Sequence, residues 1–158
     1  MKKKLYIETT VVSYLTARQS SDPMIAGHQE ATRVFWSRRD EFDLFISDLV
    51  LQEAGRGDQD AAQARLDALA SLPMLDINDE VKALAKALIA AKAVPGESLE
   101  DALHIAVATI NGLDCIVTVN FTHINNAFMR MGIRHALEAA GYAAPEICSP
   151  DELIGDQS

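Results

Sequence analysis

The chain has 158 residues, a length that fits one domain whose core needs neither disulfides nor a structural metal. Its composition, 49% hydrophobic and 23% charged, excludes a disordered or fibrous protein. A formal net charge of −9 argues against a protein that binds nucleic acid broadly over its surface, since such proteins are usually basic. It does not argue against one local cleft whose carboxylates bind Mg²⁺.

Nothing in the chain indicates a membrane span or a signal peptide. The apolar runs are too short to cross a bilayer, and the first run, after the basic N-terminus, is interrupted at once by Glu8. Cys115 and Cys148 lie far apart in the sequence, in or beside apolar runs, and are interpreted as buried thiols in a reducing cytosol. We therefore expect a cytoplasmic protein that does not contact a membrane.

Strand and helix signals alternate along the chain. Short apolar runs predict strands at residues 5–7, 44–46, 74–77, 115–119 and, more weakly, 146–148. Start and stop signals predict helices from about 25 to 39, from a cap at Asp58 through 72, from a cap at Asp79 to a stop before Pro95, from 99 to 111 after Ser98, and a last helix that ends at Gly141. This alternation predicts an α/β fold with a central parallel sheet of about five strands. Residues 1–154 are expected to form a single domain and 155–158 a frayed tail.

Four polar residues are expected at one edge of this sheet. Glu8 and Asn120 directly follow the first and fourth predicted strands, and Glu53 lies early in the segment after the second. Asp101 opens its helix and shares a face with His104 and with apolar residues, where an unpaired charge is expensive. In parallel α/β folds ligands bind outside the carboxyl ends of the strands.

Each of these residues also has a purely structural interpretation. Asp101 can close a capping box with Ser98, and Asn120 can turn the chain after a strand. Glu8 can pair with a lysine or bond the backbone amides that follow it, and Glu53 can be a solvated helix residue. Taken together, however, three carboxylates at one edge repel one another unless a cation lies among them. Oxygen ligands select Mg²⁺ or Mn²⁺, and such sites usually serve phosphodiester chemistry.

The histidines are less informative. His104 and His123 fall close to the proposed site, where either can contact the scissile phosphate or orient a metal ligand, and a partly buried structural histidine is an equal alternative. His28 and His135 are expected at surface positions of helices. The sequence has no zinc-type spacing of His and Cys, no GxGxxG, no Walker A and no GxSxG motif.

Five stretches occur in order: LYIETTVVSYL (5–15), ISDLVLQE (46–53), DALHIA (101–106), TVNFTHI (118–124) and EICSPDEL (146–153). In this order and spacing they resemble the PIN-domain nucleases and, among these, the VapC-like toxins of bacterial toxin–antitoxin pairs. The resemblance implies a three-layer α/β/α fold and a Mg²⁺- or Mn²⁺-dependent endoribonuclease that leaves a 5′-phosphate and a 3′-hydroxyl. It also implies a homodimer and a cognate antitoxin protein that blocks the site.

The resemblance assigns roles to Glu53 and Asp101, and the chemistry of the neighbouring residues completes the expected site. Glu8, Glu53 and Asp101 are the expected metal ligands, and Asn120 completes the catalytic set. Thr9 and Thr118 are expected donors to the ligands. Two positions depart from the commonest pattern, because Glu8 and Asn120 stand where most or many members carry Asp. The neutral Asn120 favours one metal ion over two.

Two alternatives remain open at this stage. One is a catalytically weakened or inactive PIN-fold module that docks a protein or an RNA, which the neutral Asn120 and the acidic balance favour. The other is a metal-dependent phosphatase, which needs an Asp nucleophile where Glu8 stands. For the antitoxin, the helix over 25–39 is one candidate groove wall, with core packing as the alternative; its apolar residues are Ala31, Val34, Phe35 and Trp36.

Overall fold

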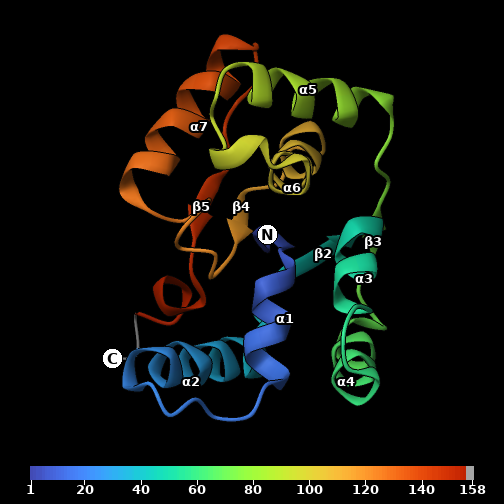
Figure 1. The fold of residues 1–158 in the computed structure, drawn as a ribbon, viewed down its shortest axis with the longest axis vertical. Helices are drawn as coiled ribbons and strands as arrows, with labels where there is room; N and C mark the ends of the chain where they lie inside the picture. Colours follow the sequence, from blue (N-terminus) through green and yellow to red (C-terminus); the bar gives the residue numbers. More distant parts are fainter. Residues whose placement is uncertain (156–158) are drawn as a thin grey trace.

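A five-stranded parallel sheet runs through the middle of the computed structural model, which describes residues 1–155 (Figure 1). The strand order is β3-β2-β1-β4-β5, so the first strand is central. The strands are β1 (Lys4–Ile7), β2 (Asp43–Ser47), β3 (Met74–Leu75), β4 (Cys115–Val117) and β5 (Glu146–Cys148). Every neighbouring pair is parallel. The predicted α/β fold with about five parallel strands is confirmed.

Helices cover both faces of the sheet (Figure 1). One layer holds α1 (Thr9–Thr16), α2 (Pro23–Ser37), α3 (Asp48–Ala54) and α4 (Gln59–Leu69). The other holds α5 (Asp79–Ala90), α6 (Leu99–Ile110) and α7 (Ala127–Ala139). Short 3₁₀ turns lie at η1 (Arg39–Glu41), η2 (Pro95–Glu97) and η3 (Pro150–Leu153). The order helix, sheet, helix is the predicted three-layer arrangement.

The core is built around β1, which has a strand on each side and a helical layer on each face. Leu5, Tyr6 and Ile7 are therefore fully buried. Burial of an aliphatic side chain of this size stabilises the fold by about 1.5–3 kcal/mol. Burial of these three side chains fixes the position of β1, and Glu8 is the first residue after the strand.

Helix α1 is not indicated by the sequence pattern. Its first residues, TTVV, are all β-branched and disfavour a helix by intrinsic propensity. In the structure Glu8 caps this helix, because its side chain accepts the amide hydrogen of Thr10. Val11 and Val12 are fully buried, so packing against the core outweighs the weak propensity.

Strand β4 ends at Val117, two residues earlier than predicted. The Thr118 amide still donates to the Cys148 carbonyl of β5, and hydroxyl groups replace strand partners from Val119 onward. The Val119 amide donates to Thr10 Oγ1 and the Asn120 amide donates to Thr118 Oγ1. Asn120 therefore lies in the turn after the strand rather than directly at its end.

Other helix ends differ from the prediction by one to three residues. Helix α2 begins at Pro23, capped by Asp22, and ends at Ser37 instead of 39. The cap of α5 is Asn78, whose side chain accepts from the Val81 amide, rather than Asp79.

The predicted end of α4 and the predicted extent of β3 are too long. Helix α4 ends at Leu69 instead of 72. Strand β3 has two residues instead of four, because it lies at the sheet edge and pairs only with β2.

The proposed groove wall on α2 is partly in the core. Phe35 is fully buried and Ala31 is 9% exposed. The ring of Phe35 contacts the rings of Trp36 and Phe42. Core packing explains Ala31 and Phe35, whereas Val34 and Trp36 are half-buried, so a groove wall at these two residues stays a prediction.

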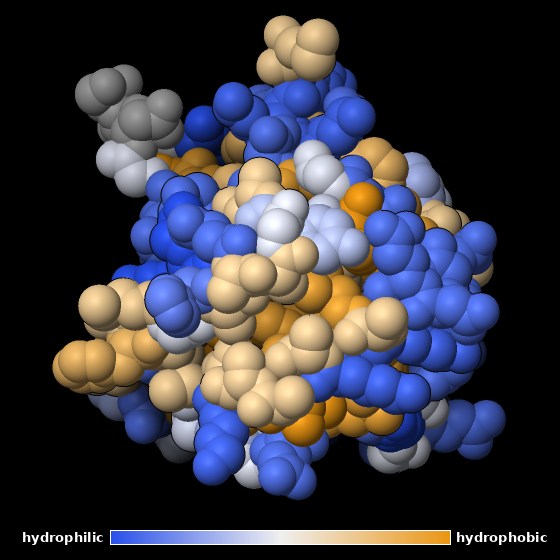
Figure 2. All heavy atoms as spheres, turned by 90° about the horizontal axis from the view of Figure 1, so that it is seen from above, coloured by the Kyte–Doolittle hydropathy of each residue, from blue (hydrophilic) through white to orange (hydrophobic). Residues whose placement is uncertain are grey.

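An apolar area is present elsewhere, on the face over α5 and α7 (Figure 2). Small side chains line a cavity between these two helices, among them Ala87, Ala91, Ala136 and Ala139. Met131 of α7 is also exposed. The predicted homodimer is not tested by this surface and stays a prediction.

Both cysteines are free and are neighbours in space; Cys148 is buried as expected, whereas Cys115 is half-buried. Cys115 lies on β4 and Cys148 on the adjacent β5. Within residues 1–155 no helix is long and apolar enough to cross a membrane. Apart from Gly155, the predicted frayed tail lies outside the described residues.

Candidate active site

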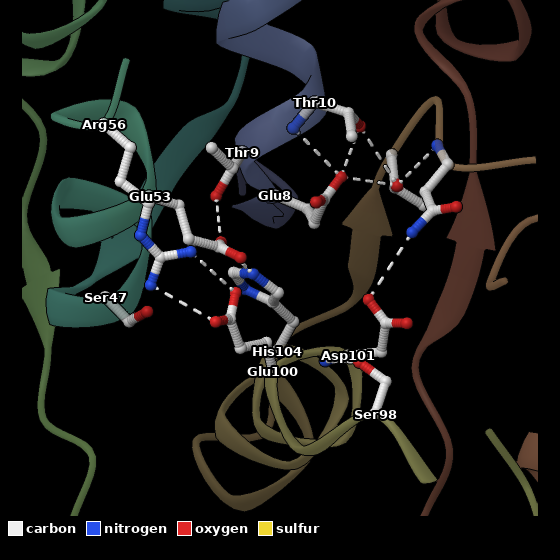
Figure 3. A network of polar contacts seen from close by, with 12 residues as sticks. Glu8, Thr9, Thr10, Ser47, Glu53, Arg56, Ser98, Glu100, Asp101 and His104 are labelled. Atoms are coloured by element: carbon white, nitrogen blue, oxygen red, sulfur yellow. Dashed lines mark hydrogen bonds and ion pairs between the residues drawn. The ribbon is translucent and has the colours of Figure 1, made fainter. Parts of the chain in front are cut away.

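Four elements bring polar side chains together at the carboxyl edge of the sheet (Figure 3). Glu8 follows β1, and Glu53 lies in the last turn of α3. Asp101 and His104 lie one turn apart on α6, and Asn120 lies in the connection from β4 to α7. Glu8 and Asp101 are 4% and 9% exposed, so both carboxyl groups are largely removed from water. Burial of two acids near each other requires compensation by hydrogen bonds or a cation.

Glu8 is held by threonine donors that converge on one oxygen. Oε1 accepts from the Thr10 amide at 3.2 Å, from the Thr10 hydroxyl, and from the Thr118 hydroxyl at 2.6 Å. Among the described residues none donates to Oε2. The structural interpretation of Glu8 as an amide acceptor is thus partly right, and it leaves one oxygen of this buried carboxylate available to a ligand.

Glu53 is held in a similar way. Its Oε1 accepts from the Thr9 hydroxyl at 2.5 Å and from His104 Nε2 at 2.6 Å. Burial acts to raise the pKa of Glu53, but the hydrogen bond and the charge of His104, together with the hydroxyl of Thr9, act against it, and the pKa is lowered to about 2. Glu53 is therefore a carboxylate at every pH at which the protein is expected to work.

His104 is 1% exposed and occupied on both ring nitrogens. Nδ1 lies 2.7 Å from the hydroxyl of Tyr6, which in turn lies 2.8 Å from Ser47 Oγ. Burial acts to lower the pKa of His104, whereas Glu53, Glu8 and Asp101 act to raise it, and the net direction is upward. His104 thus has features of both interpretations: it is buried like a structural histidine, and it contacts the candidate ligand Glu53.

Asp101 faces a different set of partners. His123 Nδ1 donates to Oδ2 at 3.0 Å, and Asn120 Nδ2 lies 3.5 Å from Oδ1. The capping box is half formed, because the Asp101 amide donates to Ser98 Oγ while the Ser98 amide donates to Pro95 instead. The carboxylate of Asp101 is thus free of the helix cap and directed to the β4–α7 connection.

Asn120 both turns the chain after β4 and contacts the acidic site. Its carbonyl oxygen accepts from the His123 amide at 3.1 Å, which closes a turn. Its amide nitrogen is directed to Asp101. The turn uses one of the two lone pairs of the carbonyl oxygen, the atom with which an amide binds a metal, and the catalytic role of Asn120 stays a prediction.

Arg56 and Glu100 border the site, and of the two Glu100 is not indicated by the sequence pattern. They form an exposed ion pair at 3.2 Å, with side chains 60% and 43% exposed. The contact with Glu53 raises the pKa of Glu100, and Arg56 opposes this effect. Arg56 thus neighbours the site through Glu100. The structural interpretation of Glu53 as a solvated helix residue is wrong, because its side chain is 17% exposed. Arg56 lies just beyond the end of α3, where its amide donates to the Glu53 carbonyl, so closeness along the chain was the available signal.

Tyr6, Ser47 and Thr10 were also missed. Tyr6 and Ser47 are fully buried strand residues whose hydroxyl groups bond each other between neighbouring strands, and Tyr6 also bonds His104 of α6. Thr10 lies next to the expected donor Thr9, but it bonds Glu8, whereas Thr9 bonds Glu53. No periodicity distinguishes these hydroxyls from ordinary core or cap residues.

The other two histidines differ from each other. His135 is exposed on α7, as expected. His28 is half-buried, because its ring bonds Asp151 of η3 and packs against the ring of Phe121. The surface expectation for His28 is wrong, and neither residue is among the contacts of the carboxylates described above.

The donor set fits a divalent cation. One ligand atom each from Glu8, Glu53 and His104 lies within 4.8 Å of the others, and this is the group with metal-ligand spacing among the described residues. Asp101 lies outside this spacing, because its carboxylate is directed to His123 and Asn120. Two of the three expected ligands therefore converge directly, and the third borders them.

A family model for the PIN domain matches residues 5–128, well over half of the chain. The chain belongs to the PIN domain family. Proteins with this domain are typically nucleases that use divalent metals. The match spans all the acidic and amide residues of the candidate site and ends at the start of α7.

Solved PIN structures share the fold at low sequence identity. VapC20 of Mycobacterium tuberculosis, a sarcin-ricin loop cleaving toxin, is 16% identical over 71% of this chain and 86% of its own, with a TM-score of 0.55. VapBC2 of Rickettsia felis, solved with a DNA fragment from the promoter, is 15% identical over 92% of this chain and 98% of that chain, with a TM-score of 0.54. No curated protein matches the chain. The likeness to VapC toxins thus lies in the fold.

Proposed function

We propose that this PIN domain is a Mg²⁺- or Mn²⁺-dependent endoribonuclease and the toxin of a bacterial toxin–antitoxin pair. The observation that carries the proposal is the placement of Glu8, Glu53 and Asp101 at one sheet edge, with Glu8 and Asp101 buried and each acid held by protein donors. Donors that fix carboxylates without neutralising them are expected around an ion site.

Each residue has a defined task in this proposal. Glu8 and Glu53 would hold the ion with the oxygens that the threonines leave available, and Asp101 would contact it directly or through water. When bound, Mg²⁺ or Mn²⁺ activates water and stabilises the negative charge that builds on the scissile phosphate. His123, at 46% side-chain exposure, keeps Asp101 oriented and remains accessible to the substrate. In-line attack leaves a 5′-phosphate and a 3′-hydroxyl.

The test is cleavage of a panel of structured RNAs in the presence of Mn²⁺, with analysis of the new ends. Asp101→Asn keeps the shape of the side chain and removes its charge, so we expect cleavage to be lost. Asp60→Asn, at an exposed position of α4, is the matched control and should cleave like the wild type. Equal activity of Asp101→Asn and the wild type would overturn the site.

The toxin assignment has a separate test. The proposed partners are RNA as substrate, a cognate antitoxin and a second copy of the chain. Expression of the chain alone in a bacterial host should arrest growth, and co-expression of the adjacent small gene product should relieve the arrest. Absence of arrest by a protein that cleaves RNA in vitro would remove the toxin assignment and keep the nuclease.

A binding module without catalysis is the second candidate. It is favoured by Asn120, which brings no charge and uses its carbonyl oxygen in a turn. Metal titration by calorimetry separates the two functions. Millimolar Mn²⁺ that fails to bind would favour the module, whereas binding that Glu8→Ala abolishes would favour the enzyme.

A further inference from the structure

A chain of four hydrogen-bonded side chains runs from the core to Glu53. Ser47 Oγ lies 2.8 Å from the Tyr6 hydroxyl, which lies 2.7 Å from His104 Nδ1, and His104 Nε2 lies 2.6 Å from Glu53 Oε1. The four residues come from β2, β1, α6 and α3. Ser47 and Tyr6 are fully buried and His104 is 1% exposed. This chain therefore ties the two helices of the site to the two central strands.

The chemistry of the groups sets the direction of the last bond. A carboxylate only accepts hydrogen bonds, so His104 Nε2 carries the hydrogen in the contact with Glu53. Nδ1 faces the Tyr6 hydroxyl inside the core. Both ring nitrogens are thus committed to protein partners, and neither presents a lone pair to the open side of the site.

We propose that His104 is a positioning residue that, oriented by Tyr6 and Ser47, fixes Glu53 so that Oε2 faces the metal, and that His104 is not itself a ligand. The inference rests on the metal-dependent site of the proposed function. It assigns a role to a residue whose nitrogen lies within metal-ligand spacing of Glu8 and Glu53. The consequence is a site whose protein ligands are all oxygen, which keeps its preference for Mg²⁺ or Mn²⁺.

Glu53 and Glu8 are held by protein donors in the same way. In both acids Oε1 is held by protein donors, from Thr9 and His104 in one and from Thr10 and Thr118 in the other. A donor to Oε1 orders the carboxylate and directs Oε2 to the ion. Loss of such a partner usually lowers metal affinity about 10- to 100-fold.

Mn²⁺ binding to the full chain, measured by electron paramagnetic resonance of the free ion, tests the proposal. His104→Leu fills the site without a donor, and we expect affinity to fall about 10- to 100-fold. His104→Gln restores an N–H at similar reach and should recover most of that loss. Tyr6→Phe, which frees the ring of His104, should give an intermediate loss. His135→Gln, at an exposed position of α7, is the control and should match the wild type.

Electron spin echo spectra of bound Mn²⁺ separate positioning from direct ligation. We expect no modulation from a directly bound imidazole nitrogen in the wild type. Such a signal, if His104→Gln removes it, would overturn the proposal in favour of a nitrogen ligand. An unchanged Mn²⁺ affinity in a folded His104→Leu protein would overturn it as well.

Two further outcomes keep the test decisive. If circular dichroism shows that His104→Leu is unfolded, His104→Gln and Tyr6→Phe carry the comparison, and equal affinity of Tyr6→Phe and the wild type then counts against positioning. Failure of the wild type to bind Mn²⁺ would remove the proposed metal site together with this inference. Binding that ignores His104 removes the inference alone.

Discussion

The hydroxyl of Thr118 donates to Glu8 Oε1 over 2.6 Å, although 110 residues separate the two along the chain. The bond joins the residue after β1 to the residue after β4. The same hydroxyl accepts from the Asn120 amide, so one side chain orders both the acid and the turn that carries Asn120. Neighbouring strands of a parallel sheet make this possible, because their carboxyl ends lie side by side.

Thr118→Val should therefore weaken both stability and metal binding. The change keeps the shape and removes one of three donors to a carboxylate that is 4% exposed. We expect the free energy of unfolding to fall by about 1–3 kcal/mol, as for a buried acceptor that loses a partner. Urea denaturation with a chelator measures the first effect, and Mn²⁺ titration the second.

Thr109→Val is the matched control for this change. Thr109 is also buried, and its hydroxyl bonds the Ile105 carbonyl within α6. It should affect stability without affecting Mn²⁺ affinity. Equal loss of affinity in both variants would mean that Thr118 has no specific effect on the site.

The pair of Glu53 and His104 should make stability depend on pH in the ion-free protein. The pKa of Glu53 is lowered from 4.5 to about 2 in the fold, so its contribution is complete above 4.5 and is lost as the pH falls toward 2. The pKa of His104 is raised above 6.5, so its contribution is complete below 6.5 and is lost as the pH rises through the raised value. Together they favour maximal stability between about pH 4.5 and 6.5.

Urea unfolding from pH 3 to 9 in the presence of a chelator measures this dependence. His104→Gln does not titrate, so the loss of stability on the alkaline side should become smaller in that variant. The acidic side should also become shallower, because His104 is the largest of the groups that lower the pKa of Glu53, although the Thr9 donor remains. An unchanged alkaline slope in His104→Gln would contradict the raised pKa.

Asn120→Asp should lower the stability of the ion-free protein and strengthen its binding of metal. The new carboxylate would keep the bond from the His123 amide, but its second oxygen would face Asp101, where Asn120 Nδ2 now lies 3.5 Å from Oδ1. Two unit charges about 4 Å apart repel by about 1 kcal/mol even in water, so stability without metal should fall by at least about that amount. Mn²⁺ should raise the melting temperature more than in the wild type. Equal Mn²⁺ stabilisation of both proteins would place Asn120 outside the reach of the ion.

Arg56→Gln should change RNA binding and leave stability nearly unaffected. The Arg56–Glu100 pair is exposed, and such pairs contribute about 0–1 kcal/mol. Removal of a cation beside the site should weaken RNA binding and lower the salt slope of affinity by about one counterion. Arg134→Gln is the control, because Arg134 forms a comparable exposed pair with Glu146 on α7 and β5. The same salt slope in both variants would exclude Arg56 from the RNA-binding surface.

Hydrophobic periodicity and turn signals were sufficient for the layers of the fold. Short apolar runs that alternate with capped helices have few arrangements in which both are buried, and the parallel sheet is one of them. The position of Glu8 after β1 followed from the same pattern. Helix α1 was not predictable, because its β-branched start opposes a helix until Val11 and Val12 enter the core.

The sequence also predicted one part of the candidate site and not the other. Local sequence located the acids, since a strand end and a helix start are marked within a few residues, and the PIN resemblance supports the same positions. The partners of each acid depend on contacts between distant elements: Thr118 on Glu8, His104 on Glu53 and His123 on Asp101. Hydrogen bonds act over about 3 Å, so only the packed chain establishes which donor meets which oxygen. The buried bond of Tyr6 to His104 is the clearest case, because nothing in either residue's neighbourhood in the sequence indicates the other.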